Sequence, residues 1–503
     1  MKPISVASAL SVAYLGWRSL GWPLIHDAPL FHYIGWLLAE GAVPYRDVFD
    51  VNMPGVYLLH WALVATVGPG DVVWRLFDLG WLALTSGLLV AYATPLGGRR
   101  AAVAAGLVFA LLHLAGGAWR AGQRDFLLCV LLLSGAWGVA RSWERRGALP
   151  PLGWSGLALG AGMMIKPLAG LFWLGCAAAG ALGARRAGRS PLAGAGAVLC
   201  GGLVVPAAVL GWLGWRGGLG PFVAVLGGYA LPFYGQVGRV SVWEAIGGHR
   251  YGWPVLGLLG ALGVAGLIAR VRSDVEIRRA LAAMGVVYGV AHLAVQGKGW
   301  EYHQYPLMFF LSVLATAALG PAAFTGWRWS RAMPALGRVA VLGLLAALVV
   351  VLDAKGLEAV DAPWIGEKER RVSAVVRDLE PLLRDARARE EGGRAVTVQV
   401  MDVTAGGIHA LLRLGVRQPT RFIYDFHFFH DGGDGRIQAL RAEFVSGLET
   451  AHPAAIVVFK DAWLAPGYER LADLPALSAL LERAYALAVE GDGYRIYAKR
   501  TDS

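Results

Sequence analysis

The sequence predicts a polytopic α-helical membrane protein that ends in a small soluble α/β domain. Of its 503 residues, 56% are hydrophobic and only 16% are charged, whereas soluble globular proteins average about 25% charged residues. Apolar stretches long enough to cross a bilayer recur from residue 4 to residue 353. From residue 354 onward, charged residues become dense and the apolar runs shorten to the length of strands. We therefore predict a transmembrane domain at residues 1–353 and an extracytoplasmic α/β domain at residues 354–503.

The apolar stretches divide into eleven expected transmembrane helices. They lie at residues 4–24, 72–95, 101–118, 125–141, 152–165, 168–184, 192–213, 254–271, 279–296, 306–323 and 337–353. The first of them could pass for a signal peptide, but it contains Arg18 and leads into further membrane segments, so we expect a retained helix. The segment 55–69 is short for a span, which needs about 20 apolar residues.

The distribution of positive charge predicts the orientation of the chain. The formal net charge of +11 would favour nucleic-acid binding in a soluble protein, but here the arginines lie mainly in short loops between apolar segments. Arginine and lysine are concentrated in the loops 97–100, 141–146, 185–189, 270–279 and 328–338, and they are sparser in 25–54, 119–124, 214–253, 297–305 and around residue 166. The positive-inside rule then places the first group in the cytoplasm.

This orientation depends on segment 55–69 lying in the membrane interface. If 55–69 spans the bilayer instead, the N-terminus and residues 25–54 change sides. The first arrangement puts every polar cluster of the chain on the outer face of the membrane. Around Lys166-Pro167, two short helices meeting at an outer turn fit the pattern, because proline disfavours a helix through residue 166. One long tilted span is the alternative, and it would reverse the orientation of all that follows.

Several classes of site are absent from the sequence. The three cysteines, Cys129, Cys176 and Cys200, lie in apolar segments and form no CxxC pair, so we expect neither a disulfide nor a metal site from them. No Walker loop, HExxH or Gly-x-Ser-x-Gly motif is present. The sequence therefore argues against an ATP-driven pump and against a nucleotide-sugar enzyme with a cytoplasmic catalytic domain.

The C-terminal residues alternate between helical and strand patterns, which is typical of a small α/β domain. The expected helices lie at residues 366–390, 406–414, 434–450 and 468–484, and the expected strands at 395–401, 420–425, 454–460, 485–490 and 494–499.

The loop 25–54 carries the first candidate site. Apolar residues at 30, 31, 34, 37 and 38 follow helical spacing, which predicts an amphipathic helix on the membrane surface. Asp27 precedes this helix, where a carboxylate either caps the helix or faces a site, and periodicity alone favours neither. Asp47 and Asp50 could share a cation, although such residues are more often turn formers. The remaining substrate-binding candidates of the loop are His26, Tyr45, Arg46 and Asn52.

Two further clusters lie at predicted outer boundaries. The first begins an apolar segment with Gln123, Arg124 and Asp125. Charged side chains at such a boundary are costly unless they form an ion pair or contact water. Arg124 suits phosphate oxygens, and Asp125 could polarise an acceptor or hold Arg124; a plain boundary ion pair is the alternative. Lys166 could neutralise a lipid-linked phosphate or merely snorkel to the interface.

The stretch GKGWEYHQYP, residues 297–306, forms the last cluster. It combines aromatic rings with hydrogen-bonding groups at Lys298, Trp300, Glu301, Tyr302 and His303. Sugar recognition needs a stacking face surrounded by donors and acceptors, whereas an ordinary aromatic belt needs only the rings. The polar residues of 214–253 form a weaker candidate for a lid.

Four stretches together give the chain a family resemblance. They are HDAPLFHYIGWLLAEGAVPYRDVFDVNMPGVYLLHW, GQRDFLL, GMMIKPLAG and KGWEYHQYPL. The chain resembles the GT-C membrane glycosyltransferases, and more closely the bacterial branch related to protein mannosyltransferases and to aminoarabinose and galacturonosyl transferases of lipid A. The resemblance covers roughly residues 5–320.

The resemblance implies transfer of a sugar from a polyprenyl-phosphate donor to an envelope lipid, glycan or protein. It implies a multi-pass protein of the cytoplasmic or inner membrane, with its active site and C-terminal domain on the outer face. The family's loop acid corresponds to Asp27 as the general base, and the phosphate needs cations, for which Arg124, Lys166 and Lys298 are candidates. Asp125 is the second catalytic candidate.

Two departures from the family pattern affect the cofactor. Asp27 is followed by Ala28 where many relatives have a second acid, and Met53-Pro54 stands where many have Lys-Pro. No cofactor is therefore assigned, and use of a divalent cation stays open. Two other functions remain as alternatives: a transporter or flippase of lipid-linked sugars, and a non-catalytic envelope scaffold.

Overall fold

The computed structural model describes residues 2–247, 252–268, 275–320, 333–389 and 395–500. The chain forms two compact units. The helical unit consists of Met1–Trp22, Trp74–Leu210 and Gly238–Asp361, and the mixed unit of Pro23–Val73, Gly211–Val237 and Ala362–Ser503. The loop 25–54, predicted as part of a transmembrane domain 1–353, is thus grouped in space with the C-terminal residues. Each unit is described by itself.

The helical unit contains a helix at each of the eleven predicted spans. These helices are α1 (Lys2–Arg18), α4 (Asp71–Gly97), α5 (Arg99–Ala115), α6 (Arg124–Glu144), α7 (Leu149–Ile165), α8 (Ala169–Arg186), α9 (Pro191–Trp215), α12 (Gly252–Ile268), α13 (Val275–Gln296), α14 (Tyr305–Leu319) and α15 (Met333–Val360), with a short α11 (Val242–Gly247) besides. Among the described residues, five helices are long and apolar enough to cross a membrane. The helical, membrane-spanning character is confirmed, and the number of eleven crossings stays a prediction.

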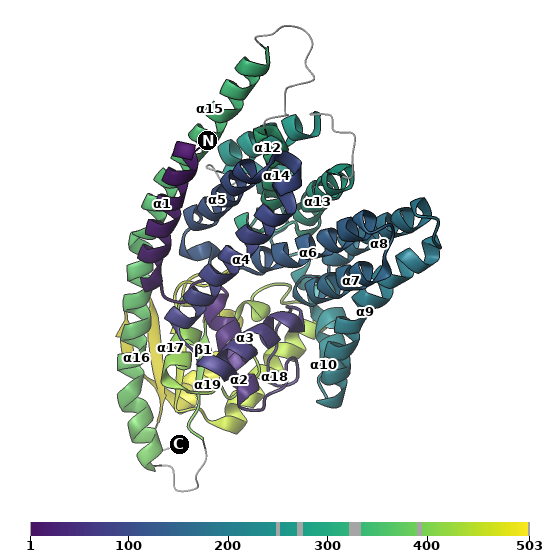
Figure 1. The fold of residues 1–503 in the computed structure, drawn as a ribbon. Helices are drawn as coiled ribbons and strands as arrows, with labels where there is room; N and C mark the ends of the chain where they lie inside the picture. Colours follow the sequence, from purple (N-terminus) through teal and green to yellow (C-terminus); the bar gives the residue numbers. More distant parts are fainter. Residues whose placement is uncertain (1, 248–251, 269–274, 321–332, 390–394, 501–503) are drawn as a thin grey trace. The chain divides into compact units, whose positions relative to one another are not determined.

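The predicted break at Lys166-Pro167 is present. Helix α7 ends at Ile165, Lys166 has extended backbone angles of φ −142° and ψ 115°, and α8 begins at Ala169. The two helices lie side by side (Figure 1). Two short helices that meet at a turn, rather than one long tilted span, therefore occupy this part of the chain.

Helices α6 and α13 run antiparallel and separate two groups of loops. At one end His292 of α13 contacts Asp125 of α6, at 2.5 Å, and at the other end Arg278 contacts Glu144, also at 2.5 Å. Loops predicted to face outward (119–124 and 297–305) therefore lie at the opposite end from the loop 141–146 and residues 275–279, which are predicted to be cytoplasmic. The rest of the predicted loop 270–279 lies outside the described residues. Which end faces the cytoplasm stays a prediction.

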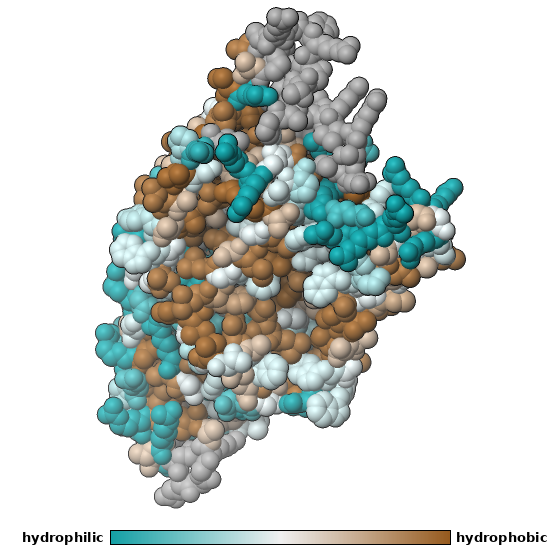
Figure 2. Space-filling model, in the orientation of Figure 1, coloured by the Kyte–Doolittle hydropathy of each residue, from teal (hydrophilic) through white to brown (hydrophobic). Residues whose placement is uncertain are grey.

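The surface of the helical unit has the polarity expected in a bilayer. Figure 2 shows hydrophobic side chains over α4 and α5, and hydrophilic ones gathered at the far ends of the helices α7 to α9. Large apolar side chains are exposed along these helices, including Leu84, Leu174 and Leu203, each more than half exposed. A lipid environment explains such exposure, because soluble proteins rarely leave large apolar patches uncovered.

In the mixed unit, the first loop folds as a helical hairpin. Its two helices are α2 (Ala28–Ala39) and α3 (Pro54–Val67). They pack closely at Gly35, where an added Cβ would lie 2.8 Å from the backbone of His60. Because α3 has 14 residues, its length is about 21 Å, short of a hydrocarbon core of about 30 Å. Its predicted position in the interface agrees with this length but stays a prediction.

The C-terminal part of the mixed unit is a four-stranded sheet with helices. Its elements are α16 (Pro363–Arg389), β1 (Val398–Met401), α17 (Gly407–Leu414), α18 (Gly435–Ala451), β2 (Ala455–Phe459), α19 (Pro475–Ala484), β3 (Tyr485–Gly491) and β4 (Tyr494–Lys499). The strand order is β1-β2-β4-β3, with β1 and β2 parallel and the other pairs antiparallel. A short α10 (Leu219–Val225) and a π-helix (Leu226–Tyr234) also belong to this unit.

Two predicted elements of this domain are wrong. Residues 420–425 form no strand of the sheet, because the side chain of Gln418 accepts the Val400 N–H at 2.8 Å and so covers the open edge of β1. The segment instead bridges to the first loop, where Phe49 N–H donates to the Arg421 carbonyl at 2.7 Å. The predicted helix 468–484 is divided into a 3₁₀ turn at Glu469–Asp473 and α19, because Pro475 cannot continue a helix begun before it.

Candidate functional site

Asp27 lies at the N-cap position of α2, yet its side chain makes no capping hydrogen bond. Its Oδ1 instead lies 3.1 Å from Nδ1 of His26, and its side chain is 14% exposed. An N-cap aspartate ordinarily accepts from the backbone of the first helical turn. The structure therefore does not support the capping interpretation, and a carboxylate that faces a site stays a prediction.

His26 has an unusual backbone conformation. Its φ is 58°, in the left-handed region that non-glycine residues seldom occupy. The side chain is buried against Asp27. Such strain costs roughly 1–3 kcal/mol and is found mainly at functional sites. The conformation of His26 therefore indicates a functional site at or next to Asp27.

Asp50 holds the first loop together. It accepts hydrogen bonds from the Tyr57 hydroxyl at 2.8 Å, the Asn52 amide at 3.0 Å and the Val51 N–H at 2.6 Å. Tyr45 donates to the Asn52 carbonyl at 2.6 Å. These contacts match the turn-forming alternative for Asp50, and substrate binding by Tyr45, Asp50 and Asn52 stays a prediction.

Arg46 and Asp47 pair with each other rather than with Asp50. The guanidinium donates to both carboxylate oxygens, at 2.9 and 2.8 Å, and this contact lowers the pKa of Asp47. Among the described residues, no group of three His, Cys, Asp or Glu side chains is placed to hold a metal ion.

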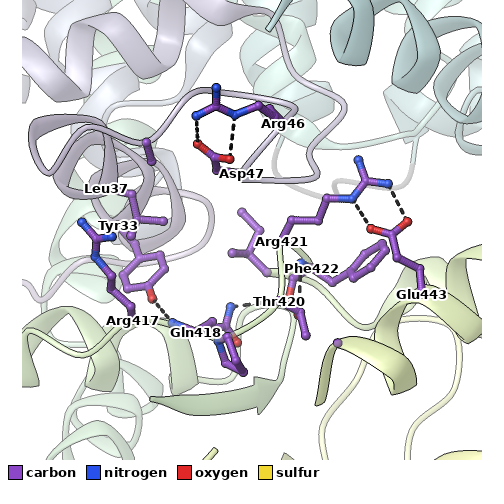
Figure 3. Close-up of a pocket in the computed structure, with 14 residues that line it drawn as sticks. Tyr33, Leu37, Arg46, Asp47, Arg417, Gln418, Thr420, Arg421, Phe422 and Glu443 are labelled. Atoms are coloured by element: carbon purple, nitrogen blue, oxygen red, sulfur yellow. Dashed lines mark hydrogen bonds and ion pairs between the residues drawn. The ribbon is translucent and has the colours of Figure 1, made fainter. Parts of the chain in front are cut away.

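The Arg46–Asp47 pair lines a cavity of about 430 Å³ in the mixed unit. Figure 3 shows this pair facing residues of the C-terminal domain across the cavity. A second bidentate pair, Arg421 with Glu443, lies opposite, with distances of 2.6 and 2.8 Å. Arg417, the third arginine of the lining, lies 3.6 Å from the Glu40 carboxylate. Because all three arginines are paired with carboxylates, the cavity offers polar recognition rather than a strong anion site.

In the helical unit, a buried cluster surrounds Asp125 at the start of α6. Nε2 of His292 lies 2.5 Å from Oδ1, and the Lys166 ammonium lies 3.3 Å from Oδ2. Asp125 and His292 are fully buried, and Arg124 and Lys166 nearly so. One end of the unit therefore holds four of the predicted residues: Gln123, Arg124, Asp125 and Lys166. Asp125 forms an ion pair with Lys166.

His292 was missed by the sequence analysis. It lies near the end of a predicted span, in the stretch AHLAVQ. A histidine inside a membrane segment is a functional candidate by default, so the signal was present. Its other ring nitrogen, Nδ1, lies 3.1 Å from the Tyr288 hydroxyl, which fixes the orientation of the ring.

The loop 297–304 joins this cluster. His303 lies with its ring centroid 6.3 Å from that of His292, and burial lowers its pKa well below the usual range. Burial and the neighbouring Arg239 lower the pKa of Lys298 to about 8. Glu301 forms an ion pair with buried Arg120, at 2.9 Å. The ring centroids of Trp300 and Tyr302 lie 5.6 Å apart, and those of Tyr302 and His303 lie 4.9 Å apart.

A second buried network in the helical unit was not predicted. Asp78 of α4 pairs with Arg75, lies 3.0 Å from Nε2 of His113, and accepts the Gly122 N–H at 2.6 Å. Nδ1 of His113 lies 2.7 Å from the Tyr305 hydroxyl. The network joins α4, α5, α14 and the loop before α6, and so holds the backbone from which Arg124 and Asp125 project.

The two units together have the architecture of a membrane protein with polar clusters at helix ends. A sequence profile of the dolichyl-phosphate-mannose-protein mannosyltransferase family matches residues 52–215. No curated protein sequence matches the chain.

Solved structures resemble the fold along nearly its whole length. The crystal structure of ArnT from Cupriavidus metallidurans bound to undecaprenyl phosphate has a TM-score of 0.55 at 15% identity, and the match covers 99% of this chain and 98% of that one. The apo oligosaccharyltransferase of Archaeoglobus fulgidus has a TM-score of 0.50 at 13% identity, covering 99% and 74%. The predicted resemblance to the GT-C membrane glycosyltransferases is confirmed at the level of family profile and fold.

Proposed function

We propose that this chain is a membrane glycosyltransferase that moves a sugar from a polyprenyl-phosphate donor to an envelope lipid, glycan or protein. The fold shared with the crystal structure of ArnT bound to undecaprenyl phosphate supports the donor class. The lipid tail of such a donor requires a site at a membrane face. We place the reaction, with the C-terminal domain, at the outer face of the cytoplasmic membrane, as the charge distribution predicts.

The observation that carries this proposal is the state of Asp27. It occupies a helix N-cap without capping, follows a residue with strained backbone, and remains accessible. Strained backbone gathers at functional sites, and a general base must be within reach of the acceptor's proton. Asp27 is therefore assigned as the general base.

The proposed reaction breaks one bond and forms another. An acceptor hydroxyl or amine attacks the anomeric carbon, the bond from that carbon to the phosphate oxygen breaks, and the acceptor's proton passes to the Asp27 carboxylate. The lipid phosphate leaves with the bonding electrons and gains negative charge. It therefore needs cations rather than a proton donor.

We assign phosphate stabilisation to Arg124, Lys166 and Lys298. Asp125 neutralises part of this charge and fixes Lys166 through its 3.3 Å contact, which makes it a positioning residue. The aromatic and polar side chains of the loop 297–304 are the candidates for holding the donor sugar, since rings stack on the apolar face of a pyranose. His26 is assigned to orient Asp27.

The test compares envelope glycans and reconstituted activity. Mass spectrometry of glycans from a deletion strain should show a missing sugar that wild-type complementation restores and Asp27→Asn does not. Purified chain in vesicles that contain one of a panel of polyprenyl-phosphate monosaccharides, with envelope extract of the deletion strain as the source of acceptor, should release polyprenyl phosphate only from the matching donor. Donor crossing the bilayer without any product would identify a transporter instead. An unchanged glycan profile after deletion would leave the scaffold interpretation.

A further inference from the structure

The mixed unit contains a second cavity, with a volume of about 400 Å³. We propose that this cavity binds a neutral saccharide of the acceptor. The inference rests on the proposed function and names the chemistry of its second substrate. A volume of this size lies within the usual range of small-molecule pockets, about 300–1,000 Å³.

The cavity lies at the carboxyl ends of the two parallel strands. Its walls come from residues 403–405, which follow β1, from residues 461–466, which follow β2, and from the first turns of α16. In open α/β sheets, ligands bind at this edge, where successive loops diverge. The position therefore follows from the topology of the sheet.

Asp402 shapes the loop after β1. Its buried carboxylate accepts the N–H groups of Ala405 at 2.6 Å, Gly406 at 3.1 Å and Gly407 at 2.7 Å. Gly406 has φ 130°, which a side chain would disfavour. The loop wall of the cavity is thus held rigidly by its own hydrogen bonds.

The lining chemistry suits a sugar. Trp364, 39% exposed, and Trp463 contribute two indole rings, and Arg371 forms an ion pair with Asp461 at 2.7 Å. Aromatic faces stack on the C–H face of a pyranose, while paired planar charges donate to and accept from hydroxyls. The lining holds two cations (Lys368 and Arg371) and two carboxylates (Glu367 and Asp461), so the balance favours a neutral ligand over a phosphate.

Lys368 connects the cavity with the proposed base. It lines the cavity, and its ammonium donates to the Thr404 carbonyl. Burial lowers the pKa of Lys368 to about 8, and the carboxylates of Asp402 and Asp27 partly oppose this shift. A saccharide bound against Trp364 and Lys368 therefore lies in the electrostatic neighbourhood of the carboxylate that would take its proton.

The test measures binding without transfer. Full-length chain in nanodiscs is titrated with a panel of methyl pyranosides (gluco, manno, galacto and 2-acetamido), and saturation-transfer NMR reports binding. We expect one member to bind, and Trp364→Ala to weaken it roughly tenfold. Trp463 packs on Phe426, with ring centroids 5.0 Å apart, so Trp364 is the cleaner variant. Trp154→Ala, an exposed tryptophan of α7, is the matched control and should bind as wild type.

The outcomes separate this inference from the proposed function. Binding that is unchanged in Trp364→Ala, or no binding by any pyranoside, would overturn the saccharide site. A wild-type chain that binds it but transfers no sugar from any donor would refute the proposed function and leave the saccharide site standing.

Discussion

Asp27 and Asp125 are both acidic residues at the start of a helix, but their surroundings differ. Asp125 is fully buried, with His292 at 2.5 Å and Lys166 at 3.3 Å. Asp27 retains 14% of its side-chain exposure and lies 3.1 Å from His26. The first carboxylate is committed to holding a cation. The second is partly exposed, and its side chain makes no N-cap hydrogen bond to its own helix.

This difference separates a positioning acid from a candidate base. A general base must reach a substrate proton, which a carboxylate enclosed by a lysine and a histidine does poorly. A buried carboxylate beside a lysine can instead fix where that cation stands. Sequence position alone could not distinguish the two roles, because both residues begin an apolar helix.

The largest effect is expected at Asp27. Asp27→Asn keeps the size of the side chain and removes its basicity, so transfer should fall by roughly 10²–10⁴-fold. The rate of sugar transfer in vesicles measures this. Asp385→Asn, at an exposed position of α16, is the control and should keep wild-type transfer. An Asp27→Asn variant with full activity would refute the assignment.

Asp125 should respond mainly through stability. Asp125→Asn leaves Lys166 and His292 without their carboxylate, and breaking a buried pair costs about 3–5 kcal/mol. Thermal unfolding followed by fluorescence should show a clearly lowered Tm. Asp27→Asn should lower the Tm less, since its carboxylate is partly exposed and its contact with His26 is longer, at 3.1 Å. Equal Tm values for both variants would remove the contrast between the two acids.

Lys166 should affect turnover as well as donor binding, because the phosphate is charged in the donor and gains further charge as it leaves. Lys166→Met preserves the length of the stem and removes the charge, so kcat/KM for donor should fall about tenfold, as expected for one lost charge-assisted contact. Steady-state kinetics against donor concentration provides the measurement. An unchanged kcat/KM would exclude Lys166 as a phosphate ligand.

The smallest effect is a pH dependence from Lys298. Its pKa is lowered to about 8, so the ammonium is charged below pH 8 and about nine-tenths neutral by pH 9. Donor affinity should therefore fall as pH rises through 8. Lys298→Arg keeps the charge at all these pH values and should flatten the profile. A profile unchanged by this substitution would exclude Lys298 as a phosphate ligand.

The helices were predictable because hydropathy reports them directly. Each of the eleven expected spans contains a helix, and the break at Lys166 followed from the proline after it. Element type was harder in the C-terminal domain. Residues 420–425 have the composition of a strand, but the Gln418 side chain covers the edge that they would need.

The sequence allowed many of the candidate site residues to be predicted, but not the contacts that they make with one another. The stretches containing Asp125, Lys166 and His303 stood out because polar residues at apolar boundaries are rare. Neither His292 nor the Asp78 network was found, since each depends on pairing across helices that one sequence does not reveal. The cavity beside Trp364 was missed for the same reason: its walls come from three separate segments.

The most direct test of the base is chemical rescue. Azide attacks an anomeric carbon without needing to lose a proton, so it bypasses a general base. With the matching donor, the Asp27→Ala variant should transfer little sugar to the acceptor. When azide is added, the variant should form glycosyl azide at about the rate at which the wild-type chain forms it. Acceptor transfer at the wild-type rate, or a folded variant that forms no glycosyl azide, would contradict the role assigned to Asp27.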